Sequence, residues 1–434
     1  MTSPQRRRPA RWQSLKIVLM TVVVTLLLTI LYANLRDPYR ELPYELAAPV
    51  SITDSQFSKT IGDLLDPAFL NGNRITTLLN GDEIFESMLG AIRSAKKTIS
   101  FESYIYWSGA IGKTFADALA ERARDGVKVH VLLDWGGSGK IEHALIDRMR
   151  TAGVQVERYH KPRWYNITRM NNRTHRKVLV IDGRVGFTGG VGIADEWSGN
   201  GLDSKHWRDT HFRVEGPVVN QMQSAFMDNW LKVRPDIYLG DDYFPTVKAN
   251  GSSTAQMFIS SAGEGGSSVR ILYLSMIAAA RKSIVLQSAY FVPDEHTISK
   301  LIEARKRGVD IQIMVPGPYN DSNVVDFASR DVWGELLENG IRIYEYQPAL
   351  FHCKVMIVDD TFVSVGSTNF DERSFHLNDE ANLNVIDAEF AKRQMTNFER
   401  DLKVSREISF ADWNNRPLSE KIWSKIMTLA SSQL

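Results

Sequence analysis

The sequence has very little cysteine and almost no net charge. Its single cysteine, Cys353, excludes any disulfide bond within the chain. The 434 residues carry 52 lysines and arginines against 51 aspartates and glutamates, so the net charge of +1 gives no general field that would attract nucleic acid. A hydrophobic content of 43% and a charged content of 24% are typical of a globular protein with sizeable cores. The length predicts more than one domain.

One stretch near the N-terminus lacks charge altogether. Ile17 to Ala33 is mostly valine, leucine and isoleucine, and it is about long enough to cross a bilayer as a helix. Five basic residues precede this stretch and only Arg36 and Arg40 follow it closely, which predicts a cytoplasmic N-terminus and an extracytoplasmic remainder. The alternative is a cleaved signal peptide, for which Leu31 to Ala33 is a poor cleavage site. We therefore expect a single-pass anchor in the cell membrane.

Two nine-residue segments, at 174–182 and 351–359, repeat one pattern. Each has a histidine, a lysine two residues later and an aspartate seven residues after the histidine. The six residues are His175, Lys177, Asp182, His352, Lys354 and Asp359. Four apolar residues separate each lysine from its aspartate, which predicts a buried strand with histidine and lysine on the same face. A lysine so close would repel a metal ion, and we expect neither a metal nor a cofactor.

The order of the predicted elements repeats as well. In the first half the periodicity predicts helices at 83–95, 112–124 and 140–152, and strands at 98–106, 127–133 and 154–159. A similar order returns after residue 270, and the two histidines lie 177 residues apart. The repeat predicts a domain duplication. The expected divisions are a tail and anchor (1–35), a tether (36–69), a first α/β domain (70–235), a linker (236–265) and a second α/β domain with a C-terminal helix (266–434).

The duplication suits one reaction at a phosphodiester. Such a displacement needs a nucleophile, positive charge around the phosphoryl oxygens and a proton for the leaving alcohol. Imidazole serves as a nucleophile or as an acid and base near neutral pH, and lysine supplies the charge. Two motifs that face each other would provide one histidine as the nucleophile, a second histidine as the acid and base, and two lysine cations. We therefore expect the two halves to share one active site.

These motifs resemble those of the phospholipase D superfamily, and the chain is most similar to bacterial cardiolipin synthases from about residue 70 onward. Further matching segments are 207–211, 215–217, 290–294 and 366–375. The resemblance implies an α/β fold of two similar domains, each a mixed sheet flanked by helices, with the active site at their interface. It also implies metal-free phosphatidyl transfer through a phosphohistidine, with His175 as the nucleophile and His352 as the acid and base.

The resemblance implies phosphatidylglycerol as the substrate: one molecule donates its phosphatidyl group to another, and glycerol leaves. A phospholipase D that uses water, a phosphodiesterase acting on nucleic acid and a catalytically idle membrane scaffold remain as alternatives. The near-neutral charge and the anchor disfavour nucleic acid as a partner. The two intact motifs disfavour the scaffold, and no obligate protein partner is evident.

Other residues are expected to support the reaction. The family carries a carboxylate where Glu380 lies, 28 residues past His352, and alignment of 209–214 with 380–385 makes Asp209 its counterpart. Gly190, Gly192, Ser367 and Asn369 are expected beside the phosphate. Gly192 departs from the asparagine that the family commonly shows, so the first half is expected to contribute backbone N–H groups only.

Two further segments carry weaker signals. Basic and aromatic residues alternate between Tyr159 and His175, which suits a membrane interface or an anionic headgroup; a nucleic-acid groove or a solvated loop would use similar residues. From this segment Arg163, Arg169 and Arg173 are our candidates for binding a lipid headgroup. Near the C-terminus one helical face is apolar, and we expect it to pack into a core. This face consists of Leu418, Ile422, Trp423, Ile426 and Met427.

Overall fold

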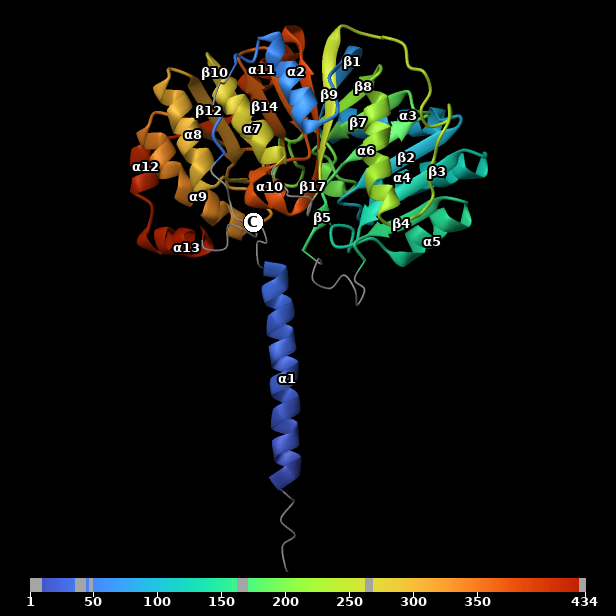
Figure 1. Ribbon diagram of the computed structural model, residues 1–434, viewed down its shortest axis with the longest axis horizontal. Coiled ribbons are helices and arrows are strands. Elements are labelled where there is room, and N and C mark those ends of the chain that lie inside the picture. The colour runs from blue at the N-terminus through green and yellow to red at the C-terminus, as the bar shows by residue number, and fades with distance from the viewer. Residues whose placement is uncertain (1–9, 36–43, 47–49, 162–170, 262–267, 429–434) are drawn as a thin grey trace, which may run out of the picture.

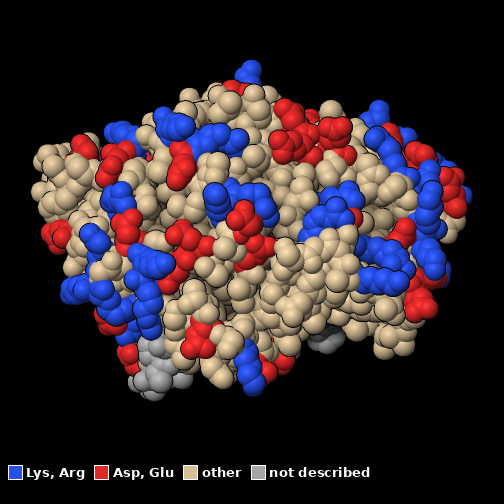
Figure 2. All heavy atoms as spheres, turned by 90° about the horizontal axis from the view of Figure 1, so that it is seen from above, with Lys and Arg blue, Asp and Glu red and all other residues tan. Residues whose placement is uncertain are grey.

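The computed structural model describes residues 10–35, 44–46, 50–161, 171–261 and 268–428. Helix α1 (Ala10–Leu35) stands apart from the folded body (Figure 1). Its segment Trp12–Tyr32 is 21 residues long and apolar enough to cross a membrane or to act as a signal sequence. The face of the body seen from above in Figure 2 shows lysines and arginines interspersed with aspartates and glutamates, as the near-zero net charge predicts.

The body is built on one continuous mixed sheet of two matching halves. In the first half the strand order from the outer edge inward is β4 (Gln155–Tyr159), β3 (Lys128–Asp134), β2 (Thr98–Ser103), β6 (Val178–Ile181), β7 (Val185–Gly189), β8 (Thr210–Glu215) and β1 (Leu70–Leu79). In the second half it is β18 (Ser405–Ile408), β13 (Arg342–Tyr346), β12 (Asp310–Pro316), β10 (Ser283–Ser288), β14 (Lys354–Val358), β15 (Phe362–Gly366), β17 (Asn378–Ile386) and β9 (Ser253–Ser260). Apart from the additional outer strand β18, the two orders match strand by strand, as the predicted α/β duplication requires.

Helices cover both halves of the sheet (Figure 1). Those of the first half are α3 (Asn80–Ser94), α4 (Ala110–Arg124), α5 (His143–Thr151) and α6 (Val219–Leu231), with the short η2 (Asp195–Trp197). Those of the second are α7 (Ser268–Ala279), α8 (Glu295–Lys306), α9 (Asn323–Glu338), α10 (Glu372–His376), α11 (Ala388–Leu402), α12 (Phe410–Asn414) and α13 (Leu418–Thr428). The small strands β11 (Phe291–Val292) and β16 (Phe370–Asp371) form a separate pair.

Local sequence signals explain where several helices begin and end. Asp294 caps α8 by accepting the Thr297 N–H at 2.6 Å, and Ser322 caps α9. Gly126 after α4 and Gly308 after α8 have φ values of +88° and +94°, a left-handed conformation that favours glycine at helix C-termini. Each glycine turns the chain into the next parallel strand, β3 or β12.

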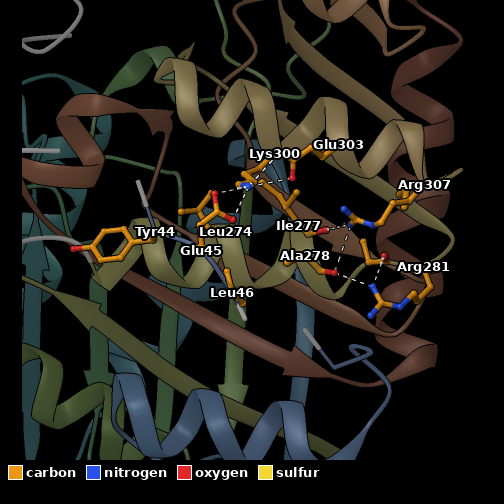
Figure 3. Close-up of a pocket in the computed structure, with 12 residues that line it drawn as sticks. Tyr44, Glu45, Leu46, Leu274, Ile277, Ala278, Arg281, Lys300, Glu303 and Arg307 are labelled. Carbon is orange, nitrogen blue, oxygen red and sulfur yellow. Dashed lines mark hydrogen bonds and ion pairs between the residues drawn. The ribbon is translucent and has the colours of Figure 1, made fainter. Parts of the chain in front are cut away.

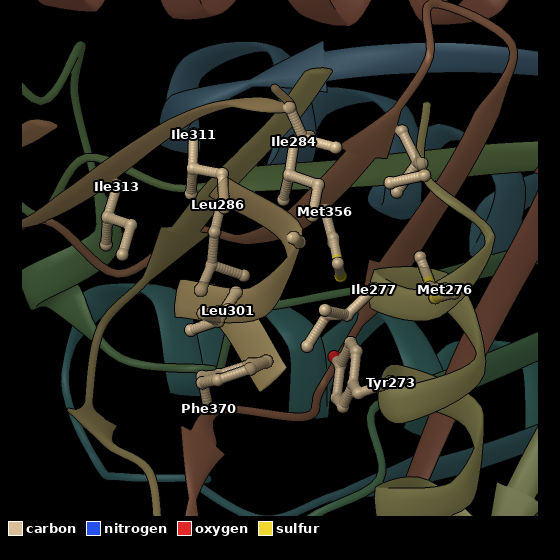
Figure 4. Packing of buried hydrophobic residues seen from close by; sticks show 14 of the residues in the cluster. Tyr273, Met276, Ile277, Ile284, Leu286, Leu301, Ile311, Ile313, Met356 and Phe370 are labelled. Atoms are coloured by element: carbon tan, nitrogen blue, oxygen red, sulfur yellow. The ribbon is translucent and has the colours of Figure 1, made fainter. Parts of the chain in front are cut away.

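Hydrophobic packing joins the halves as well as filling each of them. In the second half, residues of β10 and β12 such as Leu286 and Ile311 pack against Leu301 of α8 and Ile277 of α7 (Figure 4). A separate buried cluster combines residues of both halves, including Val178, Phe212, Val355 and Phe390. Because the halves share this core, their active-site residues are held in one fixed arrangement.

Two segments expected to be plain connections contain regular structure. The expected tether contains α2 (Ser55–Leu65), which packs on α7. Within the same tether, Glu45 pairs with Lys300 of α8 at 2.9 Å and the Tyr44 carbonyl accepts from His296, beside a cavity of about 360 Å³ (Figure 3). The expected linker contains β9, which pairs with β17 and β1 and so joins the halves. The eight residues of β9 lie between glycine- and serine-rich stretches of sequence, which weakens their strand signal.

Candidate active site

A backbone hydrogen bond holds the histidine of each motif in place, the first across the two halves and the second likewise. The His175 N–H donates to the Asp379 carbonyl at 2.9 Å, beside the pairing of β5 (Arg173–Thr174) with β17. The His352 N–H donates to the Arg208 carbonyl at 2.7 Å. Each motif strand, β6 or β14, begins just after its histidine and lies at the centre of its half. The two histidines are thus brought to the junction between the halves.

Each histidine also takes its carboxylate partner from the opposite half. His175 Nδ1 lies 3.0 Å from Glu380 Oε1, and His352 Nδ1 lies 2.7 Å from Asp209 Oδ2. Both carboxylates are completely buried. A carboxylate on Nδ1 holds the tautomer that carries its proton there, which leaves the Nε2 lone pair available. The sequence located both acids, whereas the crossed pairing appears only in the structure.

Different groups hold the two carboxylates. Glu380 accepts from the hydroxyls of Ser367 at 2.5 Å and Ser374 at 2.8 Å. Asp209 accepts from the Trp197 indole N–H at 2.9 Å and from the Thr210 backbone N–H at 2.8 Å. The site is therefore symmetric in its histidines and asymmetric in their supports.

The two lysines are buried beside the histidines. Lys177 Nζ donates to the His175 carbonyl, and Lys354 Nζ donates to the His352 carbonyl, each at 2.8 Å. Burial, with Lys354 nearby, lowers the pKa of Lys177 to about 7 against the attraction of Glu380. Burial likewise lowers the pKa of Lys354. An anion bound between these lysines would offset both their mutual repulsion and the free-energy cost of burying their charges.

The electrostatics favour neutral histidines and ionised carboxylates in the free protein. Burial lowers the pKa of His175 to about 4, and Lys177 and Lys354 add to this against the opposing charge of Glu380. Burial and Lys354 lower the pKa of His352 too, against Asp209. For Glu380, burial acts to raise the pKa, but His175, Lys177 and Ser367 outweigh it and lower the pKa to about 2. The pKa of Asp209 is lowered in the same way, mainly by His352.

Both histidines and Lys177 open onto a cavity of about 400 Å³ between the halves. Aromatic rings border the histidines. The ring of Tyr104 packs edge-on against that of His175, with 5.0 Å between the ring centres, and the ring of Trp197 packs edge-on against that of His352, with 5.3 Å between the ring centres. The other lining residues are Ile105, Trp107, Lys140, Glu196, Trp207, Tyr290, Asp321, Asn369, Asp371, Arg373 and Asn378. The cavity can hold one phosphate between two imidazoles, with Lys177 at its wall.

Asp182 and Asp359 were expected among the catalytic residues, but they lie away from the cavity. The Asp182 carboxylate accepts the backbone N–H groups of Lys96, Lys97 and Thr98, at the turn from α3 into β2. The Asp359 carboxylate accepts from the equivalent residues 281–283 at the turn from α7 into β10. Neither lines the cavity, because the four-residue strand that follows each lysine carries the aspartate to its far end. Their geometry is that of structural residues.

The four residues expected beside the phosphate fall in two layers. Asn369 lines the cavity, and its Oδ1 is buried with no hydrogen-bond partner among the described residues. Ser367 lies behind the cavity, where its hydroxyl donates to Glu380. A Cβ atom on Gly190 would come within 2.2 Å of the Asp209 carboxylate. A Cβ atom on Gly192 would come within 2.9 Å of Ile105 and 3.1 Å of the Trp197 ring. The missing side chain at Gly192 thus makes room for the tryptophan that holds Asp209.

Only one of the three headgroup candidates lies in the described part of the chain. Arg163 and Arg169 fall outside the described residues. Arg173 is half-buried, and its Nη1 is buried with no hydrogen-bond partner among the described residues. Burial, together with Arg173, lowers the pKa of the cavity residue Arg373. Arg373 thus lines the cavity, and Arg173 lies close enough to affect its pKa.

Sequence reasoning missed most of the lining residues. Ile105 and Tyr290 occupy equivalent places just past β2 and β10, where Ser103 and Ser288 donate to their carbonyls. Tyr290 in turn donates to Asp321 at 2.8 Å. Both residues lie at the carboxyl end of a predicted parallel strand, where ligands bind in α/β folds, and this position could have identified them. Within the described residues no group of three or more His, Cys, Asp or Glu is arranged to hold a metal ion.

Comparison with known proteins supplies independent findings. Residues 88–230 and 273–402 match a family described as "Cardiolipin synthase, PLD-like domain". The chain is 34% identical to cardiolipin synthase 2 of Bacillus anthracis over 361 residues (82% of this chain, 70% of that one). It is 35% identical to cardiolipin synthase 1 of Staphylococcus aureus strain COL over 370 residues (84% and 75%). The crystal structure of phosphatidylserine synthase from Haemophilus influenzae Rd KW20 shares the fold, with a TM-score of 0.68 at 14% identity, covering 87% of this chain and 100% of that one.

Proposed function

This chain belongs to the family of phospholipase D-like cardiolipin synthases, and from that premise we propose that it joins two phosphatidylglycerol molecules into cardiolipin with release of glycerol. The observation that carries the proposal is the pair of histidines on one cavity, each with a buried carboxylate on Nδ1. This arrangement gives one imidazole to attack phosphorus and a second to move the proton.

In the first step Nε2 of His175 attacks the phosphorus of the donor. The bond from phosphorus to the terminal glycerol oxygen breaks. His352 is neutral in the free protein, and the anionic phosphate of the bound donor favours its protonation, so that His352 gives the leaving oxygen its proton. Asp209, 2.7 Å from His352 Nδ1, would stabilise the cationic form of His352. Negative charge on the phosphoryl oxygens is stabilised by Lys177 and Lys354, which burial has stripped of solvent.

In the second step neutral His352 takes a proton from a glycerol hydroxyl of the second phosphatidylglycerol. The resulting oxygen attacks the phosphorus, the phosphorus–nitrogen bond breaks, and His175 returns to its neutral state. Two phosphatidylglycerols thus give one cardiolipin and one glycerol. Water in place of the second lipid would give phosphatidate instead, so the two outcomes differ only in the acceptor.

The direct test is product analysis. Full-length protein in vesicles that contain phosphatidylglycerol labelled in its terminal glycerol should release labelled glycerol and form cardiolipin in equal amounts. Formation of phosphatidate as the main product, at a rate that equals glycerol release, would replace the transferase with a hydrolase. Labelled nucleic acid should remain intact under the same conditions.

We assign the second lipid to the basic segment that ends at Arg173. Neutralising Arg163, Arg169 and Arg173 together should lower the cardiolipin-to-phosphatidate ratio more than it lowers total donor turnover, because the acceptor's phosphate loses its cations. Lys248→Gln, an exposed lysine in the segment between the halves, is the matched charge control. An unchanged ratio with reduced turnover would assign the loop to the donor or to general membrane contact.

We also propose that α1 remains as an anchor, with its N-terminus in the cytoplasm and the catalytic body outside. The support is the charge asymmetry on either side of the apolar segment. A reporter fused after Leu434 should report an extracytoplasmic position, and the protein should resist extraction by high salt. A cytoplasmic reporter signal would overturn the orientation, and a soluble product beginning near residue 34 would show cleavage.

A further inference from the structure

The C-terminal helix α13 turns its apolar face away from the protein. Leu418, Ile422, Trp423 and Ile426 are 73%, 50%, 50% and 46% exposed, respectively. Their spacing places them on one side of the helix. The sequence predicted that this face would pack into a core, and that prediction is wrong for these four side chains. Only Met427, at the edge of the face, is partly buried against the body.

The side of α13 that faces the body is the polar one. Ser424 is fully buried, and Thr428 donates to Asp331 of α9 at 3.1 Å. Glu420 accepts from Arg416 at 3.5 Å and lies 3.9 Å from an Arg330 nitrogen. A helix on the surface of a soluble protein has the opposite arrangement, with apolar residues inward. The exposed apolar stripe therefore costs free energy unless something other than water covers it.

The position of α13 indicates what covers it. The helix packs along α9, and Met427 joins Val325 and Ala328 in a small cluster that also contains Tyr290. Tyr290 lines the active-site cavity. In Figure 1, α13 lies at the same edge of the body as β5 and α10, which border the site, whereas α2 lies at the opposite edge. A bilayer in contact with α13 would therefore lie at the edge of the body where β5 and α10 border the site.

Charge on the helix points to the same partner. Lys421 and Lys425 adjoin the apolar stripe. Lys425 is exposed, whereas the Lys421 ammonium donates to the Asn414 carbonyl at 2.6 Å. The α13 carboxylate, Glu420, is on the inward side with Arg416. Helices that lie in a membrane interface combine an apolar face with tryptophan and lysines whose ammonium groups reach the headgroup phosphates. A second protein copy would need a complementary apolar surface and would gain nothing from these lysines.

We propose that α13 is an interfacial helix that seats the active-site edge on the surface of an anionic bilayer. Its stripe of Leu418, Ile422, Trp423 and Ile426 enters the boundary between headgroups and acyl chains. Contact at α13 fixes how the body leans on the membrane, which the single helix α1 does not do by itself. The choice of a lipid partner rests on the proposed function, while the contact itself is measured without turnover.

The test uses depth-dependent fluorescence quenching on the full-length protein in proteoliposomes. The natural Cys353 is fully buried, so the unaltered chain provides the labelling background. Leu418→Cys and Ile426→Cys would each carry a bimane label, and Leu64→Cys on α2, an exposed leucine (60%) at the opposite edge, is the matched control. Lipids with a spin label high on the acyl chain should quench the two α13 sites about 5-fold more than the control.

Equal quenching at α13 and at Leu64→Cys would overturn the proposal. Disulfide cross-linking between two Leu418→Cys copies, with no quenching by lipid, would also overturn it and assign the stripe to a second copy. Loss of lipid quenching in the Ile422→Ser/Trp423→Ser double variant labelled at 418 would support it. Failure of the proposed function would appear as absent cardiolipin, and the quenching pattern would still report on α13.

Discussion

Replacing Glu380 with glutamine should slow phosphatidyl transfer by about 10²-fold. The pKa of Glu380 is lowered from 4.5 to about 2, with His175 the largest contributor against burial. That difference corresponds to about 3 kcal/mol of favourable interaction with the charges around it. His175 becomes cationic as its Nε2 attacks phosphorus, so this interaction is at its strongest in the transition state. Losing about 3 kcal/mol there gives the predicted factor of about 10².

The same variant has a stability signature. Because the folded-state pKa of Glu380 lies below the unfolded value, its contribution is present above pH 4.5 and is lost as pH falls towards about 2. Glu380→Gln should therefore lower the melting temperature at pH 7 and flatten the acid limb of the stability curve.

The assay is the initial rate of cardiolipin formation per folded molecule, with folding followed by circular dichroism. Glu345→Gln is the matched control, because Glu345 is a buried carboxylate that pairs with Arg330 and Arg406 outside the cavity. This control should lose stability and keep its rate. A Glu380→Gln rate within 3-fold of the unaltered enzyme would refute the role of the crossed carboxylate, where about 100-fold is expected.

Four further changes test other parts of the site. His175→Ala and His352→Ala should each abolish transfer, and the double variant should be no worse, since the two act as a unit; activity should survive metal chelation. Raising the pH through about 7 neutralises Lys177, so kcat/KM should fall. The contribution of Lys177 to stability should rise between about pH 7 and pH 10.5, because over that range the unfolded chain still holds the lysine proton that the folded protein has lost. Asp182→Asn should cost about 2 kcal/mol of stability, seen by denaturant unfolding, and leave the rate per folded molecule unchanged. Gly192→Asn should destabilise by about 1–3 kcal/mol through overlap with Trp197, and a melting temperature equal to wild type would contradict that packing.

Several features followed directly from the sequence. The spacing of His175 and Lys177, repeated at His352 and Lys354, indicated a duplication and the superfamily, and the strand pattern and the family match confirm both. The apolar run near the N-terminus indicated a long helix, which α1 provides. These signals are local and periodic, so a single sequence carries them.

The remaining features depend on contacts between distant segments. Neither acid could be assigned to its histidine, because the pairing of β5 with β17 and the bond from His352 to Arg208 decide it. Spacing grouped Asp182 with the reacting residues, but a strand separates it from the cavity. Nothing in the sequence explained a glycine at position 192, because the Trp197 ring that occupies the space of its missing side chain comes close only in the folded protein. The apolar face of α13 has the pattern of a core helix, and only packing on α9 reveals that it points outward.

The central claim is that His175 carries the phosphatidyl group at a site built jointly by both halves. Rapid quenching of the enzyme during turnover of phosphatidylglycerol, followed by mass spectrometry of its peptides at alkaline pH, tests this most directly. We expect a phosphatidyl adduct on the peptide with His175, formed and consumed at the rate of cardiolipin synthesis, and a much smaller adduct in Glu380→Gln. An adduct on the peptide with His352, or steady cardiolipin formation with no adduct on either histidine, would contradict the account.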